Sequence, residues 1–192
     1  MIKTLAFLHT SPVHVATFNR LLAEIDPSVA ARHVVDESLL DEARATGTIT
    51  PALEQRIAAA LGDASAPDGA VVLCTCSTIG GSAEAAGMGA GRVVLRVDRP
   101  MAERAVALGD RILVAAALAS TLAPTRALIL DAAHAAGKEI ELRVGARDAD
   151  VIVLAQASMA AAAPLCADLG TPILSSPRLG LEAALAACYA QG

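Results

Sequence analysis

The chain has 192 residues, which suffices for one large domain or two small ones with a self-sufficient core. Its formal net charge of −5 and its aromatic content of 2% argue against the basic surface and the stacking platforms of nucleic-acid binders. Hydrophobic residues reach 55%, but the apolar runs are shorter than the roughly 20 residues that a membrane-spanning helix needs.

The N-terminal apolar run before His9 and Pro12 is too short for a signal peptide. The cysteines show neither a disulfide framework nor the ligand spacing of a zinc site; they are Cys74, Cys76, Cys166 and Cys188. We therefore expect a soluble, cytoplasmic protein without a metal ion.

Short β-rich runs alternate along the first half with longer helical stretches. The stretch 14–25 has apolar residues at helical spacing, and Thr50 followed by Pro51 is typical of a helix start. In chain order we expect a strand at 4–10, a helix at 14–25, a strand at 31–35, a loop at 36–49, a helix at 50–64 and strands at 69–76 and 92–98.

The alternation continues through the second half. We expect a helix at 100–109, a strand at 111–117, a helix at 123–137, strands at 139–144 and 149–158, a helix at 161–170, a strand at 171–176 and a helix at 180–191. Such alternation predicts an α/β fold with mostly parallel sheets flanked by helices.

One internal similarity indicates two lobes. "DGAVVLCTCSTIGG" (68–81) and "DADVIVLAQASMAA" (148–161) share an acidic start, an apolar strand and small polar residues after it. Two similar lobes would face each other across a cleft, with both polar clusters at the carboxyl ends of strands, where ligands bind. The predicted lobes are 1–97 with the C-terminal helix of about 177–192, and 98–176. The alternative is that any two buried parallel strands look alike.

The segment "CSTIGGSAEAAG" (76–87) suits a reactive thiol. Cys76 follows a strand and precedes a helical stretch, Ser77 and Thr78 can donate hydrogen bonds, and Gly80 with Gly81 permits a tight turn into the helix. The free amide groups of a helix N-terminus favour an anion such as a thiolate. Alternatively, both cysteines of "CTC" are apolar fillers, because free cysteine is often buried.

These motifs resemble the aspartate/glutamate/hydantoin racemase superfamily. "CST" (76–78) resembles the family's first cysteine motif, with Cys74 as the other candidate thiol. "GDRILVAAALASTLAPTRALI" (109–129) resembles its mid-chain strand and loop, "DVIVLAQASM" (150–159) its second motif, and "TPILSSPRLGLEAAL" (171–185) its last strand and helix. The resemblance covers nearly the whole chain and implies cofactor-independent cysteine catalysis on a small carboxylate.

The chain departs from the family pattern at Gln156, which stands where two-cysteine racemases carry their second thiol. An amide has no useful pKa and cannot carry a proton, although it can orient a substrate or stabilise an oxyanion. The resemblance assigns Cys76 the role of base or nucleophile and gives substrate-binding roles to Thr10, Ser11, Ser77, Thr78, Ser120, Thr121, Gln156 and Ser158. Several of these hydroxyl groups are equally suited to cap the helices that follow them.

Three functions follow as hypotheses. The first is a racemase- or isomerase-like enzyme that acts through Cys76. The second is a single-cysteine decarboxylase, cis–trans isomerase or lyase of the same fold, and the third is a non-catalytic carboxylate-binding protein. Neither NAD nor pyridoxal phosphate is implied, and the chain is expected to bind no nucleic acid and no membrane, with a homo-oligomer possible. His14, His33 and His134 are interpreted as surface or helix residues.

Overall fold

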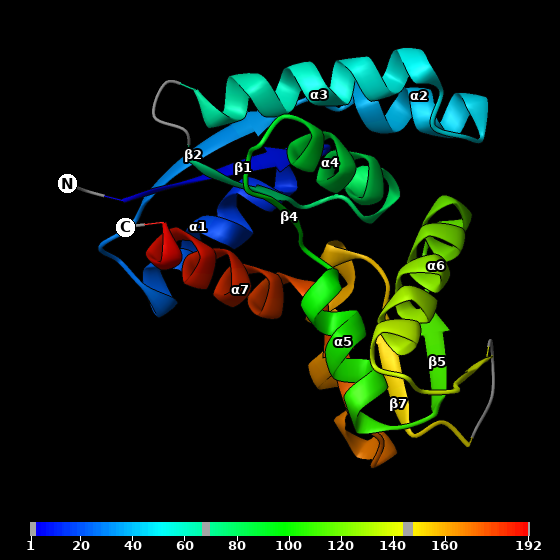
Figure 1. Ribbon diagram of the computed structural model, residues 1–192. Helices are drawn as coiled ribbons and strands as arrows, with labels where there is room; N and C mark the ends of the chain where they lie inside the picture. Colours follow the sequence, from blue (N-terminus) through cyan, green and yellow to red (C-terminus); the bar gives the residue numbers. More distant parts are fainter. Residues whose placement is uncertain (1–2, 67–69, 144–147, 192) are drawn as a thin grey trace.

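Two four-stranded parallel sheets form the frame of the computed structural model, which describes residues 3–66, 70–143 and 148–191 (Figure 1). The first sheet has the order β2-β1-β3-β4, with β1 (Thr4–His9), β2 (Ala30–Val35), β3 (Val71–Cys74) and β4 (Val94–Arg96). The second has the order β6-β5-β7-β8, with β5 (Arg111–Ala115), β6 (Glu141–Arg143), β7 (Val151–Leu154) and β8 (Ile173–Ser175). All pairings in both sheets are parallel, so the carboxyl ends of the strands in each sheet lie at one edge.

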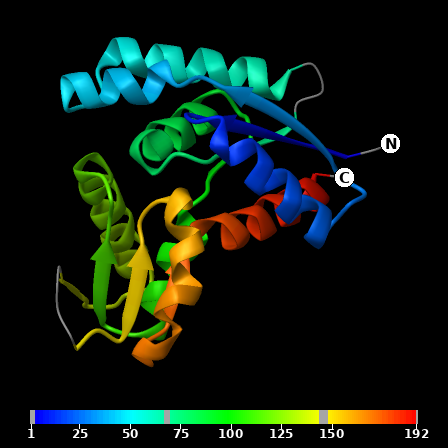
Figure 2. The ribbon, with the colours of Figure 1, turned by 180° about the vertical axis from the view of Figure 1, so that it is seen from behind.

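The first sheet is covered by helices on both faces (Figures 1 and 2). Successive residues of a strand point to opposite faces, so Leu8 packs into one core and Phe7 into the other. The Leu8 core is closed by α2 (Ser38–Thr46), α3 (Pro51–Ser65) and α4 (Ser77–Gly89). The Phe7 core is closed by α1 (Val13–Ile25) and α7 (Ser176–Ala190). Helices α1 and α4 thus lie on opposite faces of one sheet.

The second sheet packs against α5 (Arg99–Leu108) and α6 (Ala119–Ala135), whose core includes Met101, Ile112 and Ile129. A kinked 3₁₀ helix, η1 (Ala157–Leu169), connects β7 to β8. Helix α7 then returns to the first lobe, where a Cβ atom at Gly180 would lie 2.4 Å from the carbonyl oxygen of Val97. Only glycine allows this close approach, which holds the last helix against the end of the first sheet.

The predicted α/β class with two mostly parallel sheets is confirmed, but the predicted loop at 36–49 is wrong. Residues 38–46 form helix α2. The Asp36 carboxylate accepts a hydrogen bond from the Ser38 amide at 3.0 Å, Leu39 and Ala43 are buried one turn apart, and Gly47 ends the helix with a φ of 69°. These two residues make up the whole buried face of α2, so the spacing of apolar residues in the sequence did not indicate a helix.

Other boundaries also differ from the prediction. The helix expected from 123 begins at Ala119, which places Ser120 and Thr121 in its first turn. The helix expected at 161–170 is the 3₁₀ helix η1, and Gly80 and Gly81 lie inside α4 instead of forming a turn. The predicted strand ends at 69 and 144 fall outside the described residues. In the described part of the chain, no helix is long and apolar enough to cross a membrane.

Candidate active site

A cavity of about 180 Å³ lies between the lobes, where the loops that follow β1, β3, β5 and β7 meet helix α2. Both lobes contribute to its wall. The lining residues from the first lobe are Thr10, Ser11, Val13, His14, Leu40, Arg44, Thr75, Cys76, Ser77 and Thr78, and those from the second are Leu118, Thr121, Gln156, Ala157 and Ser158. The fold therefore brings the carboxyl ends of strands from both sheets to one cavity.

Cys76 is the residue immediately before helix α4. Strand β3 ends at Cys74, and Cys76 keeps an extended backbone with φ −109° and ψ 116° before the helix begins at Ser77. The first-turn amide groups of α4 lack partners within the helix, and their partial positive charge favours an anion beside them. The residue is 9% exposed, so its thiol reaches the cavity while remaining largely shielded from water.

Cys74 occupies a different environment although it is only two residues away. It is fully buried in the core under α3 and α4, and its Sγ lies 3.9 Å from the carbonyl oxygen of Cys76. Burial raises the pKa of the Cys74 thiol to about 12, with a smaller effect from the nearby Cys76. Both cysteines belong to this core cluster, but Cys76 also lines the cavity and Cys74 does not.

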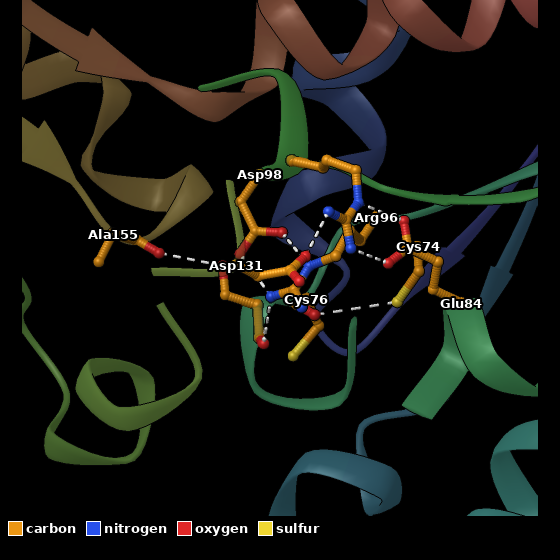
Figure 3. Close-up of polar contacts among 9 residues, drawn as sticks. Cys74, Cys76, Glu84, Arg96, Asp98, Asp131 and Ala155 are labelled. Atoms are coloured by element: carbon orange, nitrogen blue, oxygen red, sulfur yellow. Dashed lines mark hydrogen bonds and ion pairs between the residues drawn. The ribbon is translucent and has the colours of Figure 1, made fainter. Parts of the chain in front are cut away.

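The turn that carries Cys76 is fixed by hydrogen bonds to both lobes (Figure 3). The Ser77 hydroxyl donates to the carbonyl oxygen of Ala155 in the second lobe at 3.0 Å. The Arg96 guanidinium donates to both oxygens of the Asp98 carboxylate at 2.7 and 3.0 Å and to the Ser77 carbonyl oxygen at 3.4 Å. A Cβ atom on Gly80 would lie 3.2 Å from Arg96, so the absence of a side chain there makes room for the guanidinium.

A second ion-pair network joins the lobes beside this turn. The Arg99 guanidinium on α5 donates to Glu84 of α4 at 2.8 Å and to Asp131 of α6 at 2.9 Å (Figure 3). These contacts, with the Ser77–Ala155 hydrogen bond, hold the lobes in the arrangement that forms the cavity.

On the opposite wall, Gln156 follows β7 as Cys76 follows β3. Its side-chain oxygen accepts hydrogen bonds from the backbone amides of Ala117 at 2.7 Å and Leu118 at 3.0 Å. The side chain therefore ties the loop after β5 to the end of β7. Only its NH₂ group keeps donors that are not used in these two bonds.

Solved structures resemble this arrangement. No protein-family model matches the sequence, and no curated protein matches it. A candidate Asp/Glu racemase from Yersinia pestis is 14% identical and has a TM-score of 0.69, with 97% of this chain and 99% of that chain covered. The aspartate racemase of Picrophilus torridus is 12% identical, with a TM-score of 0.68 and coverage of 97% and 94%. An unliganded arylmalonate decarboxylase is 14% identical, with a TM-score of 0.57 and coverage of 97% and 93%. The chain has the two-lobed racemase fold. The resemblance stated from the sequence is thus confirmed at the level of the fold.

The racemase fold brings nearly all of the predicted site residues together. Thr10, Ser11, Cys76, Ser77, Thr78, Thr121, Gln156 and Ser158 line the cavity. Ser120 does not; it lines a neighbouring, mainly apolar pocket of about 760 Å³ between the end of α2 and helix α6. Arg44, Thr78 and Leu118 line both spaces, so the two are adjacent.

Two ionisable residues of the cavity, Arg44 and His14, were missed from the sequence. Arg44 lies in the last turn of α2, in the segment predicted to be a loop, and His14 was interpreted as a surface or helix residue. In the part of the chain that the structure describes, Arg44 is the only lysine or arginine that lines the cavity, and His14 is the only histidine. The sequence feature that could have indicated Arg44 is a basic residue directly after a small apolar residue, in "DEARA" (41–45); the structure shows that this alanine, Ala43, is buried.

Three histidines gather on the α1 face of the first sheet. The rings of His9 and His33 stack with a centroid distance of 5.1 Å, and His14 lies 6.2 Å from His9. Burial, followed by the proximity of His33 and His14, lowers the pKa of His9 to about 3. Burial also lowers the pKa of His14 and of His33. These rings are therefore neutral at pH 7, where a neutral imidazole can accept a proton.

We expect acid to destabilise the fold through His9. A histidine in the unfolded chain has a pKa near 6.5, whereas the pKa of His9 in the folded protein is about 3. Between these two values the unfolded state binds more protons, so the free energy of unfolding falls as the pH drops. The loss from His9 alone should be about 2 kcal/mol at pH 5. Urea unfolding between pH 7.5 and 5 measures it, and His9→Phe should flatten the profile. An equal pH slope in the wild type and in His9→Phe would contradict this assignment.

Proposed function

We propose that the chain is a cofactor-independent, racemase-like enzyme that moves a proton at the carbon beside the carboxylate of a small substrate. The observation that supports this most directly is the set of ionisable groups around one cavity, namely Cys76, His14 and Arg44. A neutral imidazole can take a proton from the substrate carbon while a thiol supplies one on the other side, the resulting thiolate and imidazolium can do the reverse, and a guanidinium is a partner for a carboxylate. The likeness in fold to Asp/Glu racemases agrees with this assignment.

Cys76 is proposed as the base or nucleophile. It is the residue directly before the first turn of α4, and the amide groups of that turn suit the negative charge that develops on a substrate carboxylate during proton removal. Cys76 is preferred to Cys74 for this role because Cys76 lines the cavity and Cys74 is fully buried.

His14 is proposed as the second acid–base group, in place of the thiol that the resemblance expects at Gln156. His14 lies in the first turn of α1 and Cys76 at the start of α4, and these helices cover opposite faces of the first sheet. Both residues line the cavity, and this placement supports an approach to a bound substrate from two sides. Two acid–base groups on opposite sides of a carbon are what racemisation requires.

Arg44 and the hydroxyl groups are proposed to hold the carboxylate. Thr10, Ser11, Thr78 and Thr121 surround the same cavity from both lobes. Arg44 pairs with Asp41, whose exposed carboxylate lies 4.0 Å away on α2, so this ion pair is weak and leaves the guanidinium able to bind a ligand.

Solvent deuterium exchange tests the proposed reaction. The purified protein would be incubated in D₂O with each enantiomer of aspartate and glutamate, with an arylmalonate and with a hydantoin, and followed by proton NMR. Loss of a signal at the carbon beside the carboxylate, catalysed by the wild type, is the expected result. If none of these compounds exchanges or decarboxylates but one of them binds, the third hypothesis, a non-catalytic carboxylate-binding protein, replaces this proposal.

Arg44→Gln should weaken the binding of whichever substrate exchanges. Loss of one charge-assisted contact to a carboxylate is expected to raise KM about tenfold, with a smaller effect on kcat. Arg44→Lys should recover part of the loss, because it keeps the charge without the paired donors. Arg104→Gln removes the same charge from an exposed site on α5 and is the matched control. Equal KM values for Arg44→Gln and Arg104→Gln would rule out the carboxylate contact.

A one-sided reaction is the second candidate, and one observation favours it. The described residues that line the cavity from the second lobe carry no acid–base side chain; they are Leu118, Thr121, Gln156, Ala157 and Ser158. A decarboxylase or lyase that protonates from one side needs only Cys76. Such an enzyme would release carbon dioxide from the malonate, or form a single enantiomer, and the same NMR experiment distinguishes both outcomes from racemisation.

A further inference from the structure

Four polar side chains form a continuous chain of hydrogen bonds from the cavity wall to the outer surface of the first lobe. The Thr75 hydroxyl lies 2.8 Å from Nδ1 of His9, Nε2 of His9 lies 2.8 Å from Nδ1 of His33, and Nε2 of His33 lies 3.0 Å from the side-chain oxygen of Asn19. Thr75 lines the cavity next to Cys76, whereas Asn19 is exposed on α1. His9 between them is fully buried.

The two imidazole rings are held by aromatic packing. Phe7 stacks on His33 with a centroid distance of 4.8 Å and an interplanar angle of 15°, and on His9 with 5.7 Å and 6°. A half-turn of either ring would break its hydrogen bonds, and a tilt of either ring would break the stack. The heavy atoms are therefore fixed, and the arrangement changes only by movement of protons.

When both rings are neutral, one proton order satisfies every contact. A neutral imidazole has one donor and one acceptor nitrogen. The Asn19 oxygen accepts, so His33 carries its proton on Nε2 and accepts at Nδ1. His9 then donates from Nε2 and accepts at Nδ1, which leaves the Thr75 hydroxyl to donate to His9.

One added proton on His33 reverses this order. Protonated His33 donates from both nitrogens, so Nε2 of His9 must accept and the single proton of His9 must lie on Nδ1. His9 then donates to Thr75, and the Thr75 hydroxyl turns to the carbonyl oxygen of Leu8, which lies 3.3 Å away. The count balances, because His33 gains one proton while His9 and Thr75 keep one each. The hydrogen bonds stay satisfied in both states.

The groups around this chain leave His33 as the site of protonation. On α1, the His14 ring lies 6.2 Å from that of His9 but is not one of the four side chains of the hydrogen-bonded chain, and Arg20 pairs with Glu24, which also binds Arg178 of α7. After β2, the Asp36 carboxylate binds Ser38 and Arg56. Helix α3 packs on the other face of the sheet, where Arg32 donates to its carbonyl oxygens. Of the two histidines in the hydrogen-bonded chain, His33 is half-buried and reaches the surface, whereas His9 is fully buried.

We propose that His33 and His9 are positioning residues. Protonation of His33, at the outer edge of the first sheet, reverses the direction of the hydrogen bond between His9 and the Thr75 hydroxyl beside Cys76. The consequence at the cavity is a change in one hydroxyl, from a donor to His9 in the neutral state to an acceptor from His9 after protonation of His33. This inference concerns proton positions and does not rest on the proposed reaction.

Nitrogen-15 NMR of the imidazoles between pH 4 and 8 tests it, because the shifts of Nδ1 and Nε2 report which nitrogen carries the proton. We expect His9 to change from the Nε2–H to the Nδ1–H tautomer at the pH where His33 titrates. Asn19→Asp places a carboxylate beside His33 and should raise both midpoints together by about one pH unit. Gln55→Glu makes the same amide-to-carboxylate change at an exposed site of α3, on the other face of the sheet, and should move neither.

Two results would overturn the proposal. One is a His9 tautomer that stays fixed while His33 titrates in the wild type or in Asn19→Asp. The other is a His33 that binds no proton anywhere between pH 4 and 8. A second readout separates positioning from a purely structural role: the pH profile of Cys76 alkylation by iodoacetamide should carry an inflection at the His33 midpoint, and Thr75→Val should remove it.

Discussion

Cys76→Ser is expected to lower the rate of deuterium exchange about 10³-fold, with the fold unchanged. The substitution keeps a small polar side chain at the same position before α4, but a hydroxyl group is far less acidic than a thiol and supplies no base at neutral pH. Positioned acid–base groups contribute about 10²- to 10⁴-fold to proton transfer, and the expected loss lies within this range. The rate is measured by NMR in D₂O with the substrate that the wild type exchanges.

Two other cysteines provide the controls. Cys74→Ala removes the neighbouring thiol from the core, and Cys166→Ser makes the same chemical change in η1, away from the cavity. Both should keep exchange rates within a few-fold of the wild type, with Cys74→Ala also losing some stability because it leaves a small cavity in the core. If Cys74→Ala and Cys76→Ser lose exchange equally while both remain folded, the assignment of the catalytic role to Cys76 is wrong.

The order of strands and helices was predictable because each strand is a short apolar run bounded by polar or helical sequence. Strand β3 is buried along its whole length, and its continuous apolar run indicated a strand covered on both faces. Helix α2 was missed because its buried stripe consists of Leu39 and Ala43 alone, surrounded by charged residues. Its formation depends on packing against α3 and α4 and on the Asp36 contact, which local periodicity does not describe.

The position of Cys76 was predictable for a similar reason. Polar residues directly after a parallel strand must lie at the carboxyl edge of the sheet, so Thr10, Cys76 and Gln156 converge once the strands are placed. His14 and Arg44 were not predictable in this way. Each lies within a helix, and only the placement of α1 and α2 against the sheet brings their side chains to the cavity.

The roles of two predicted residues also depend on tertiary contacts. Ser77 and Gln156 were expected to contact the substrate, and both line the cavity. However, the Ser77 hydroxyl donates to Ala155, and the Gln156 oxygen accepts from Ala117 and Leu118. Their hydrogen bonds join backbone segments of the two lobes or of neighbouring strands. Sequence identifies a polar side chain near the site, but not the partner that it already has.

His14→Gln is expected to separate proton removal from racemisation. In the proposed reaction neutral His14 takes the proton from one enantiomer while the Cys76 thiol supplies one on the other side. The Cys76 thiolate and protonated His14 that result carry out the reverse step with the other enantiomer. Glutamine keeps the size and hydrogen-bonding capacity of the side chain but carries no proton. Exchange of one enantiomer should therefore persist, while exchange of the other and interconversion of the two fall by about 10²-fold or more. Cys76→Ser should show the opposite preference between the enantiomers.

His134→Gln on the exposed side of α6 is the matched control and should leave both rates unchanged. The mirrored pattern is informative because a merely structural role for His14 would reduce exchange of both enantiomers together. If His14→Gln loses neither rate while the wild type racemises, the second proton must come from another group, and the pairing of Cys76 with His14 is wrong. If the wild type itself exchanges only one enantiomer, a single thiol acts from one side, and His14 then serves the cavity as a neutral hydrogen-bonding group whose replacement by glutamine changes KM more than kcat.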